Sequence, residues 1–406
     1  MIGTIQHNAA SRRQRIATIL VAIAWAAATL WDYRAFDLRI FDGMALILLV
    51  GFLLIAAEPL QGFLLRRRDG WLLFATVAGY AAIGFALHGH RSSLAIILLA
   101  AISFALIGRR DWLADSRLFQ WLLIAHIVFF IIQFLGFYLL KEVIDFQAFM
   151  GANSRLNQRI YQIRAAGLFQ EPNSYSLNIF VLGTIVALQR ANFMLIVLAA
   201  GTMTLSESVW GMGAAVVLLF LHALVRYQSP AQMIKGLVIF GLVIGVVFNA
   251  YLWLTKQPQE AIPYFYTRVL GVTSDPSTQD RYLRNGCLPE EQAAATKVSA
   301  ATSAQSWILG EGLSTRFFTE CLPANGLSFL LKSFGIAGLV ALLAGFALAL
   351  RGLPPGSTLY AALAIGFSFT TYPLVTYVIF WLWLPAIIGL LHRHNSDPDP
   401  ANVTEA

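Results

Sequence analysis

The sequence Arg164-Ala-Ala-Gly-Leu-Phe-Gln-Glu171-Pro-Asn-Ser174 stands where a polar, basic segment turns directly into an apolar run at 175–189. It brings a cation, a carboxylate, a glycine and a proline close together at the mouth of a hydrophobic helix. Proline suits the first turn of a helix, so Glu171 falls at or near the helix cap, where the helix dipole favours a negative charge. Glu171 therefore either caps the helix or takes part in the chemistry of a functional site.

The composition of the chain is that of a membrane protein. Its 406 residues are 58% hydrophobic and 12% charged, whereas a soluble domain has roughly 25% charged residues. A helix that crosses a bilayer needs about 20 apolar residues. We therefore predict an all-α, polytopic integral membrane protein with about 12 transmembrane helices, at 16–31, 40–57, 71–88, 92–108, 118–140, 175–189, 192–205, 208–225, 236–254, 327–350, 357–374 and 375–391. The run at 192–205 is short and continuous with 208–225, so a single broken helix there stays open.

Basic residues in the predicted loops give the orientation, because short cytoplasmic loops carry an excess of lysine and arginine. The short loops of one side hold only Arg34, Arg39 and Arg91. The other side holds Arg12, Arg13, Arg15, Arg66, Arg67, Arg68, Arg109, Arg110, Arg117, Arg190, Arg226, Lys235, Arg351 and Arg393. This asymmetry places both termini in the cytoplasm. It also accounts for much of the net charge of +7 without any binding of nucleic acid.

The predicted topology divides the chain into membrane segments and two long outward loops. The divisions are a cytoplasmic tail at 1–15, transmembrane helices 1–5 at 16–140, an outward loop at 141–174, helices 6–9 at 175–254, a large outward loop at 255–326, helices 10–12 at 327–391 and a disordered cytoplasmic tail at 392–406. Loops of such length in a compact protein are usually functional.

The cysteines and histidines give weaker signals. Cys287 and Cys321 both lie in the second outward loop; in an oxidising compartment they would form a disulfide, and two free thiols are the alternative. No P-loop, dinucleotide-binding glycine pattern or zinc-protease motif occurs, and no metal or cofactor is expected. His126 and His222 are single polar groups in spans and are expected to hydrogen-bond to neighbouring helices.

Arginine is concentrated on the outward side, at Arg155, Arg159, Arg164, Arg268, Arg281, Arg284 and Arg316. The guanidinium fork suits phosphate oxygens and keeps its charge, so an anionic ligand is expected. Contact with solvent or lipid head groups is the alternative, and it applies best to Arg155, Arg159 and Arg268. Arg164, Arg281 and Arg284 stand among turn-forming or motif-like residues and are the stronger candidates.

Two further ionisable residues border apolar spans on this side. Glu207 lies in Thr204-Leu-Ser-Glu-Ser208, between two hydrophobic pieces, where an ionisable residue is a functional candidate. Lys332 lies in the first turns of the predicted span at 327–350. It either snorkels to the membrane surface or meets the anion.

Three pieces of the sequence resemble the O-antigen polymerase/ligase superfamily of bacterial envelope glycosyltransferases. Arg164-x-x-Gly167-x-Phe169-x-Glu171-Pro172-Asn173 is similar to the family's Arg-x-x-Gly-x-Phe-x-x-Pro-Asn/Ser element, and Thr204-Leu-Ser-Glu-Ser-Val-Trp-Gly211 stands at the place of its Ser-Arg-x-x turn. The third piece comprises Asp280-Arg281, Trp307-Ile-Leu-Gly-Glu-Gly312, Asn325-Gly326 and Leu331-Lys-Ser-Phe-Gly-Ile-Ala-Gly338, which is similar to the family's Gly-Ile-x-Gly span. The resemblance covers residues 160–350 and the overall pattern of spans.

The resemblance implies a membrane glycosyltransferase of GT-C-like architecture in the bacterial inner membrane. It implies metal-independent, inverting transfer on the periplasmic side, with undecaprenyl-pyrophosphate-linked glycan as donor and a second glycan as acceptor. The product would be O-antigen or a related surface polysaccharide. Membrane lipids are further partners, a chain-length regulator stays an open one, and no nucleic acid is expected.

The resemblance also assigns roles to residues. Arg164 and Arg281 would bind the pyrophosphate and stabilise the leaving charge, with Arg284 and Lys332 as helpers. A carboxylate would activate the acceptor hydroxyl, with Glu171 as the first choice and Glu207 as the second.

Two departures from the family pattern favour a polymerase. Glu207 stands where many members have arginine, and Ala324 stands where ligases typically have histidine. An O-antigen ligase that transfers glycan to lipid A-core is the alternative. A transporter of lipid-linked saccharide is a second alternative, and it would need charges deep in the spans.

Overall fold

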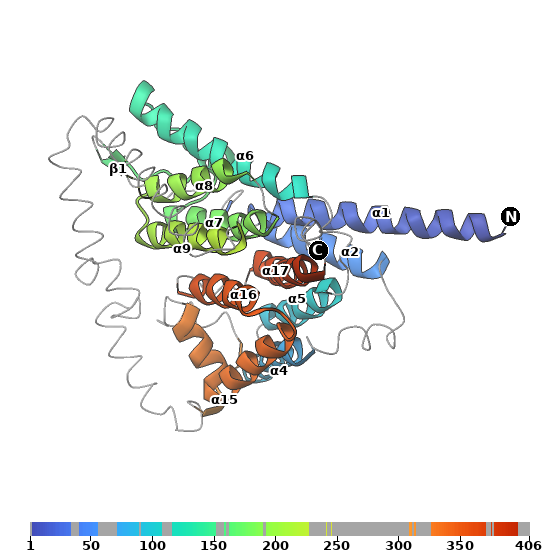
Figure 1. Ribbon diagram of the computed structural model, residues 1–406. Helices are drawn as coiled ribbons and strands as arrows, with labels where there is room; N and C mark the ends of the chain where they lie inside the picture. Colours follow the sequence, from blue (N-terminus) through green and yellow to red (C-terminus); the bar gives the residue numbers. More distant parts are fainter. Residues whose placement is uncertain are drawn as a thin grey trace, which may run out of the picture.

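The computed structural model describes residues 2–33, 40–55, 71–88, 91–107, 116–151, 158–159, 162–189, 192–226, 241, 245, 308–310, 312–313, 326–370, 375 and 377–396. Within them the chain forms a bundle of helices (Figure 1). A short hairpin, β1 (Gln158–Arg159) paired antiparallel with β2 (Gln162–Ile163), lies in the loop at 141–174 that is predicted to face outward.

The helices of the first half follow the predicted apolar runs. They are α1 (Ile2–Ala28), α2 (Ile40–Ile55), α4 (Trp71–His88), α5 (Arg91–Ile107) and α6 (Ser116–Leu135), which continues as one π-helical turn over Gly136–Leu140. A single-turn 3₁₀ helix follows at Ala148–Met150. α1 begins well before the predicted span at 16–31, because the preceding residues contain no proline and continue the helix into polar sequence.

Three mutually packed helices follow the opening stretch of the sequence. They are α7 (Pro172–Leu188), α8 (Phe193–Leu205) and α9 (Val209–Arg226). α8 and α9 pack against each other and against α7. The runs at 192–205 and 208–225 are therefore two helices that are joined by a turn and pack against each other, and whether they make two crossings or one stays a prediction.

The last three described helices are α15 (Gly326–Ala349), α16 (Pro355–Ser368) and α17 (Val378–Ser396). α15 is interrupted at Gly335, whose φ of 59° and ψ of −174° are not helical. The predicted span at 236–254 lies outside the described residues apart from Gly241 and Gly245.

Two helices form the centre of the bundle. α7 is buried along its whole length except at Asn173, and α17 is buried from Val378 to Leu391. α17 packs against α1, α2, α5, α7 and α16, and α7 packs against α6, α8, α9 and α17. A helix that is apolar on most of its surface is expected to be buried. The buried positions of α7 and α17 agree with this expectation.

The apolar helices indicate a membrane protein. Within the described residues, three helical segments are long and apolar enough to cross a membrane, namely Arg117–Leu140, Val209–Arg226 and Phe329–Ala349, and several other apolar helices are shorter. Large apolar side chains also lie on the outer surface of the bundle, with Ile47 72% exposed, Leu54 76% and Leu343 68%. Such exposure suits contact with lipid. The structure confirms the helical class and the apolar helices, and the number of crossings stays a prediction.

Candidate functional site

The first half of the opening stretch is a buried loop fastened to α6. The amide nitrogens of Ala166 and Gly167 both donate to Oε1 of Gln133, at 2.7 and 2.9 Å. Nε2 of Gln133 in turn donates to the carbonyl of Ile144 at 2.8 Å. Gly167 has a φ of +57°, and a Cβ there would lie 3.2 Å from the amide nitrogen of Phe130. Glycine at this position of the motif therefore permits both the turn and the close approach to α6.

The ring of Phe169 anchors the same loop in the core. It is 1% exposed, and its centroid lies 6.3 Å from that of Trp31, 5.4 Å from His126 and 6.2 Å from Tyr175. These partners come from the end of α1, from α6 and from α7. The aromatic position of the motif is thus a packing residue, and it fixes the backbone between Arg164 and Glu171.

The base of the loop at 141–174 is fastened to the segment that follows α1. The hydroxyl of Tyr33 donates to the carbonyl of Phe146 at 3.0 Å, and Nε2 of Gln147 donates to the carbonyl of Leu168 at 2.6 Å. Burial, and secondarily the charge of Asp145, raise the pKa of Tyr33. The tyrosine therefore remains a hydrogen-bond donor at neutral pH.

Glu171 occupies the N-cap position of α7, with φ −135° and ψ 146°, and Pro172 begins the helix. Its carbonyl accepts from the amide of Tyr175 at 3.1 Å. Its side chain makes no capping hydrogen bond. The predicted position at the helix cap is confirmed, and the choice between a capping role through the helix dipole and a chemical role stays a prediction. The half-buried carboxylate lies at the N-terminus of the helix.

Glu207 lies in the turn between α8 and α9. It is 6% exposed and has a φ of +55°. Its amide donates to the carbonyl of Thr204 at 3.1 Å. Residues other than Gly, Asn and Asp are uncommon in this left-handed backbone region. They adopt it where the surrounding structure enforces it. The protein therefore places a buried carboxylate in a conformation that local backbone preference disfavours.

Polar side chains join this turn to the start of α7. We call Asn173, Ser176, Ser206, Ser208 and Gly211 the serine junction. Oγ of Ser208 donates to Oδ1 of Asn173 and accepts from the amide of Gly211 at 2.9 Å, so it also caps α9. The hydroxyls of Ser176 and Ser206 lie 3.1 Å apart. The first two motif pieces, distant in sequence, thus form one structural unit.

Glycine allows α9 to approach α7 at this junction. A Cβ on Gly211 would lie 2.4 Å from Oγ of Ser176, and a Cβ on Gly183 would lie 2.7 Å from Cδ2 of Leu218. The two helices therefore run side by side from the junction into the bundle. Small residues serve close packing of this kind in membrane proteins.

The described part of the third motif piece forms a separate junction made of backbone. We call Gly84, Gly310, Gly312 and Gly335 the glycine junction. The last three have φ of +76°, +83° and +59°. A Cβ on Gly310 would lie 2.5 Å from the carbonyl oxygen of Ser333, and one on Gly84 would lie 2.2 Å from that of Leu313. No side chain fits at these positions.

Hydrogen bonds satisfy the backbone that this insertion buries. The amide of Gly312 donates to the carbonyl of Ser333 at 2.9 Å, beside the break in α15. The amide of Leu313 donates to the carbonyl of Tyr80 at 2.9 Å, and its carbonyl accepts from Oγ of Ser93 at 2.8 Å. The segment therefore ties α4, α5 and α15 together.

The predicted site residues fall into three groups. Arg164 and Glu171 flank the buried loop, and Glu207 lies in the serine junction that adjoins it. Lys332 is half-buried on α15, which packs on α4, and it precedes Ser333, whose carbonyl accepts from the amide of Gly312. Arg281, Arg284, Cys287 and Cys321 lie outside the described residues.

Sequence patterns did not reveal the residues that build the site, and the hydrogen bonds expected of His222 are not formed within the described residues. Gln133, Asn173 and Ser208 were not expected to make these contacts, although the Ser208-x-x-Gly211 spacing is a helix-start signal. The expectation for His222 is wrong within the described residues, where neither ring nitrogen has a hydrogen-bond partner. Its ring instead lies 5.7 Å from that of Phe193, in a stacked arrangement. Nδ1 of His126 also has no such partner there.

The described residues offer Glu171 at the start of α7, Glu207 in the turn joined to that start, and Arg164 in the loop that leads into the helix. Among the described residues, no group of three or more His, Cys, Asp or Glu side chains gathers as a metal site would require. The arrangement could bind an anion through Arg164 and receive a proton through Glu171 or Glu207. No model of a known protein family matches the chain, and a search of curated proteins returned no similar sequence.

Proposed function

We propose that the chain is a membrane glycosyltransferase that polymerises undecaprenyl-pyrophosphate-linked oligosaccharide repeat units into O-antigen or a related surface polysaccharide. The observation that carries the proposal is the hydrogen bond from Ser208 to Asn173. It joins the motif piece of Arg164 and Glu171 to that of Glu207, as a shared active site needs. The proposed architecture is GT-C-like, with about 12 crossings, cytoplasmic termini and a periplasmic site in the inner membrane.

The proposed reaction is a metal-independent, inverting displacement. A hydroxyl of the acceptor glycan attacks the anomeric carbon of the donor while the bond from that carbon to the pyrophosphate oxygen breaks. A carboxylate receives the hydroxyl proton, and the negative charge departs with the lipid pyrophosphate. Arg164, with Arg281, Arg284 and Lys332, would stabilise that charge.

We assign the base to Glu207 and the orientation of the acceptor to Glu171. Glu207 is the more buried of the two and is held in the left-handed region, so its position is strongly constrained. Glu171 is half-buried and follows a loop that is itself fixed. This reverses the order expected from the sequence, where Glu171 came first.

The test is polymer formation in a host that supplies matching lipid-linked repeat units. Arg164→Ala and Arg281→Ala should each abolish long-chain polymer, because the leaving charge loses a partner. Arg155→Ala is the control, since this loop arginine has no assigned role. Membrane fractions should contain each variant at the level of the parent protein. Full-length polymer in both variants would contradict the mechanism.

The same experiment separates a polymerase from a ligase. Loss of a polymerase leaves a single repeat unit on lipid A-core, whereas loss of a ligase leaves polymer on its lipid carrier. The absence of histidine at Ala324 favours the first result. Polymer stranded on the carrier would identify the chain as a ligase.

One observation favours a transporter of lipid-linked saccharide. α15 is interrupted at Gly335, and interrupted helices form the binding sites of many transporters. Here the interruption is packed against the backbone of Ile308 and Gly310, and a Cβ on Gly335 would lie 2.4 Å from the amide nitrogen of Gly310. We therefore rank this function below glycosyl transfer. Flipping of the saccharide by purified protein in liposomes, without new glycosidic bonds, would reverse the ranking.

A further inference from the structure

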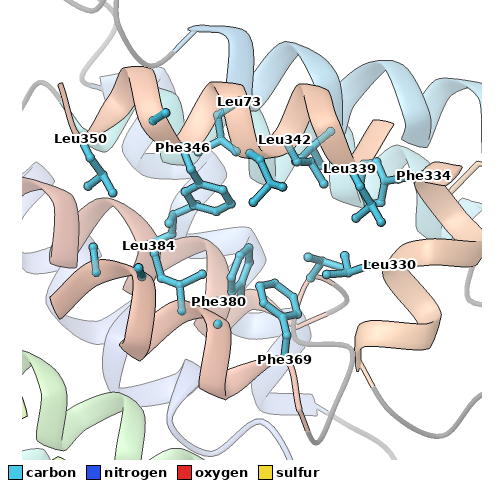
Figure 2. A pocket seen from close by; sticks show the side chains of 18 of the residues that line it. Leu73, Leu330, Phe334, Leu339, Leu342, Phe346, Leu350, Phe369, Phe380 and Leu384 are labelled. Atoms are coloured by element: carbon cyan, nitrogen blue, oxygen red, sulfur yellow. The ribbon is translucent and has the colours of Figure 1, made fainter. Parts of the chain in front are cut away.

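An elongated cavity of about 460 Å³ separates α15 from α16 and α17. Figure 2 shows Leu342 and Phe346 on one wall, with Phe380 and Leu384 on the opposite wall. Leu350 lies toward one end of the cavity, and Leu330 and Phe334 lie toward the other. The cavity therefore follows α15 along much of its length.

The lining of the cavity is apolar throughout its described residues. Every lining side chain is aliphatic or aromatic, and Gly366 adds none. The one N–H group among these side chains, Nε1 of Trp381, donates to the carbonyl of Val375 at 2.9 Å. A cavity without polar partners does not retain ordered water and suits an apolar ligand.

The cavity has access to the outer surface of the bundle. Leu343, Ala362 and Gly366 line it and are exposed as well. Exposed apolar side chains also lie on α15 and α16 beside this opening, and such a surface suits contact with membrane lipid. A hydrocarbon chain can therefore enter from the side.

Basic side chains stand at the Leu350 end. Arg351 follows Leu350 directly and is exposed. His392 of α17 lies against the end of α15, with Nε2 3.0 Å from the carbonyl of Ala349. Arg393, the next residue, is exposed. Two exposed arginines therefore stand next in sequence to residues at this end of the apolar cavity, and recognition of a lipid with an anionic head group uses such charges.

This end of the cavity is remote from the candidate glycosyltransferase site. Nε1 of Trp210, next to the serine junction, donates to Oγ1 of Thr370 at 2.9 Å, just beyond the end of α16. Leu350 instead precedes Pro355, where α16 begins. The length of α16, roughly 20 Å at 1.5 Å per residue, separates the two places.

We propose that the cavity binds one acyl chain of an anionic phospholipid, whose phosphate lies between Arg351 and Arg393. The apolar walls select the chain, and the two arginines select the charge of the head group. The lipid would connect α15 to α16 and α17 across the cavity. This site is separate from the proposed glycosyl transfer and does not depend on it.

The test uses the purified full-length protein in nanodiscs of equal parts phosphatidylglycerol and phosphatidylethanolamine, followed by native mass spectrometry. The wild-type protein should retain one phosphatidylglycerol. Gly366→Leu should lower this occupancy at least tenfold, because a Cβ at Gly366 meets open space and a larger side chain can fill the cavity. Gly356→Leu is the matched control, since this exposed glycine of α16 is also unobstructed and does not line the cavity.

Charge removal gives a second, independent result. Arg351→Gln and Arg393→Gln should each lower the preference for phosphatidylglycerol over phosphatidylethanolamine roughly fivefold, as expected for one surface charge near an anionic lipid. These two variants keep the proposal testable if Gly366→Leu does not fold. Equal retention in all variants, no retention by the wild type, or no preference between the lipids would overturn it. Selective retention of an added undecaprenyl phosphate in place of phosphatidylglycerol would also overturn it.

Discussion

The serine junction and the glycine junction both bury irregular backbone between helices, but they are built from different chemistry. The first is held by side-chain oxygens, with Ser208 bonded to Asn173 and to the amide of Gly211. The second is held by backbone groups, with the amides of Gly312 and Leu313 donating to carbonyls of α15 and α4. Buried backbone in a membrane must be satisfied in either way.

The difference distinguishes a functional site from a structural fastener, by which we mean a junction that only holds helices together. The serine junction presents ionisable groups beside it, Glu171 half-buried and Glu207 buried in a disfavoured conformation. The glycine junction excludes even a Cβ at Gly310 and Gly335, so it leaves no space for a ligand. We infer that substitutions at the first should change chemistry more than stability, and that substitutions at the second should do the reverse.

Glu207 gives the largest expected effect. Glu207→Gln keeps the shape and removes the proton acceptor, so the rate of polymer formation should fall about 10²- to 10⁴-fold. Glu207→Gly should lose the same activity but raise the free energy of unfolding by about 1 kcal/mol. Relief of the left-handed backbone gains about 1–2 kcal/mol, which exceeds the roughly 0.4–1 kcal/mol that the greater freedom of glycine in the unfolded chain costs. Polymer formation in vitro and thermal unfolding in detergent measure the two effects.

Glu171→Gln is the matched comparison for Glu207. If Glu171 orients the acceptor, its loss should raise KM for the acceptor more than it lowers kcat. Wild-type activity in Glu207→Gly would show that Glu207 only shapes the turn. The two junctions would then both be fasteners, and the comparison would fail.

The glycine junction should show the opposite pattern. Gly310→Ala should lower the free energy of unfolding by about 2–5 kcal/mol, since it combines the cost of a left-handed alanine with a clash against the backbone of α15. Gly352→Ala is the control, because Gly352 has a φ of +81° but a Cβ there would meet nothing within 4 Å. It should lose only about 1–2 kcal/mol. Equal losses for the two variants would show that the close approach at Gly310 carries no cost.

The sequence predicted the helices better than the junctions. The runs at 40–57 and 208–225 correspond to Ile40–Ile55 and Val209–Arg226, because apolar length and local helix signals are properties of a continuous segment. Pro172 likewise marked the start of α7. The interruption at Gly335 was not predicted, since it depends on a chain segment that arrives from Gly310.

The candidate site could be predicted in part for the same reason. Spacing singled out Arg164, Glu171 and Glu207, and the structure shows that their two segments meet at Ser208. It could not reveal that Gln133 of α6 holds the loop, because a lone glutamine in an apolar span has many possible partners. Lys332 and Gly335 belong to the same sequence motif and lie on the same helix, which Gly335 interrupts. Motif membership alone did not distinguish a chemical role from a packing role.

Ser208 tests whether the serine junction is also a structural link. Ser208→Ala removes the cap of α9 and the bond to Asn173, and it should cost about 0.5–2 kcal/mol of stability. Ser208→Thr keeps the hydroxyl and should recover most of the loss. Polymer formation should fall in the alanine variant only if the junction positions Glu207. Normal activity with reduced stability would place Ser208 among the fasteners.

Thr184 provides the smallest and cleanest test, because it is a side-chain fastener on the same helix as the candidate site. Its hydroxyl accepts from Nε1 of Trp383 at 2.9 Å, and its carbonyl accepts from the hydroxyl of Tyr360 at 2.6 Å. Thr184→Val leaves the indole N–H without that partner and should cost about 0.6 kcal/mol, the average for such bonds between membrane helices. Thr76→Val is the control, since the hydroxyl of Thr76 bonds only within its own helix in the described structure, to the carbonyl of Leu72 at 2.8 Å. Activity at permissive temperature should be unchanged in both variants. A large loss of activity in Thr184→Val would mean that packing at the buried centre of α7 controls the position of Glu171. The functional site would then extend deeper into the bundle than the serine junction.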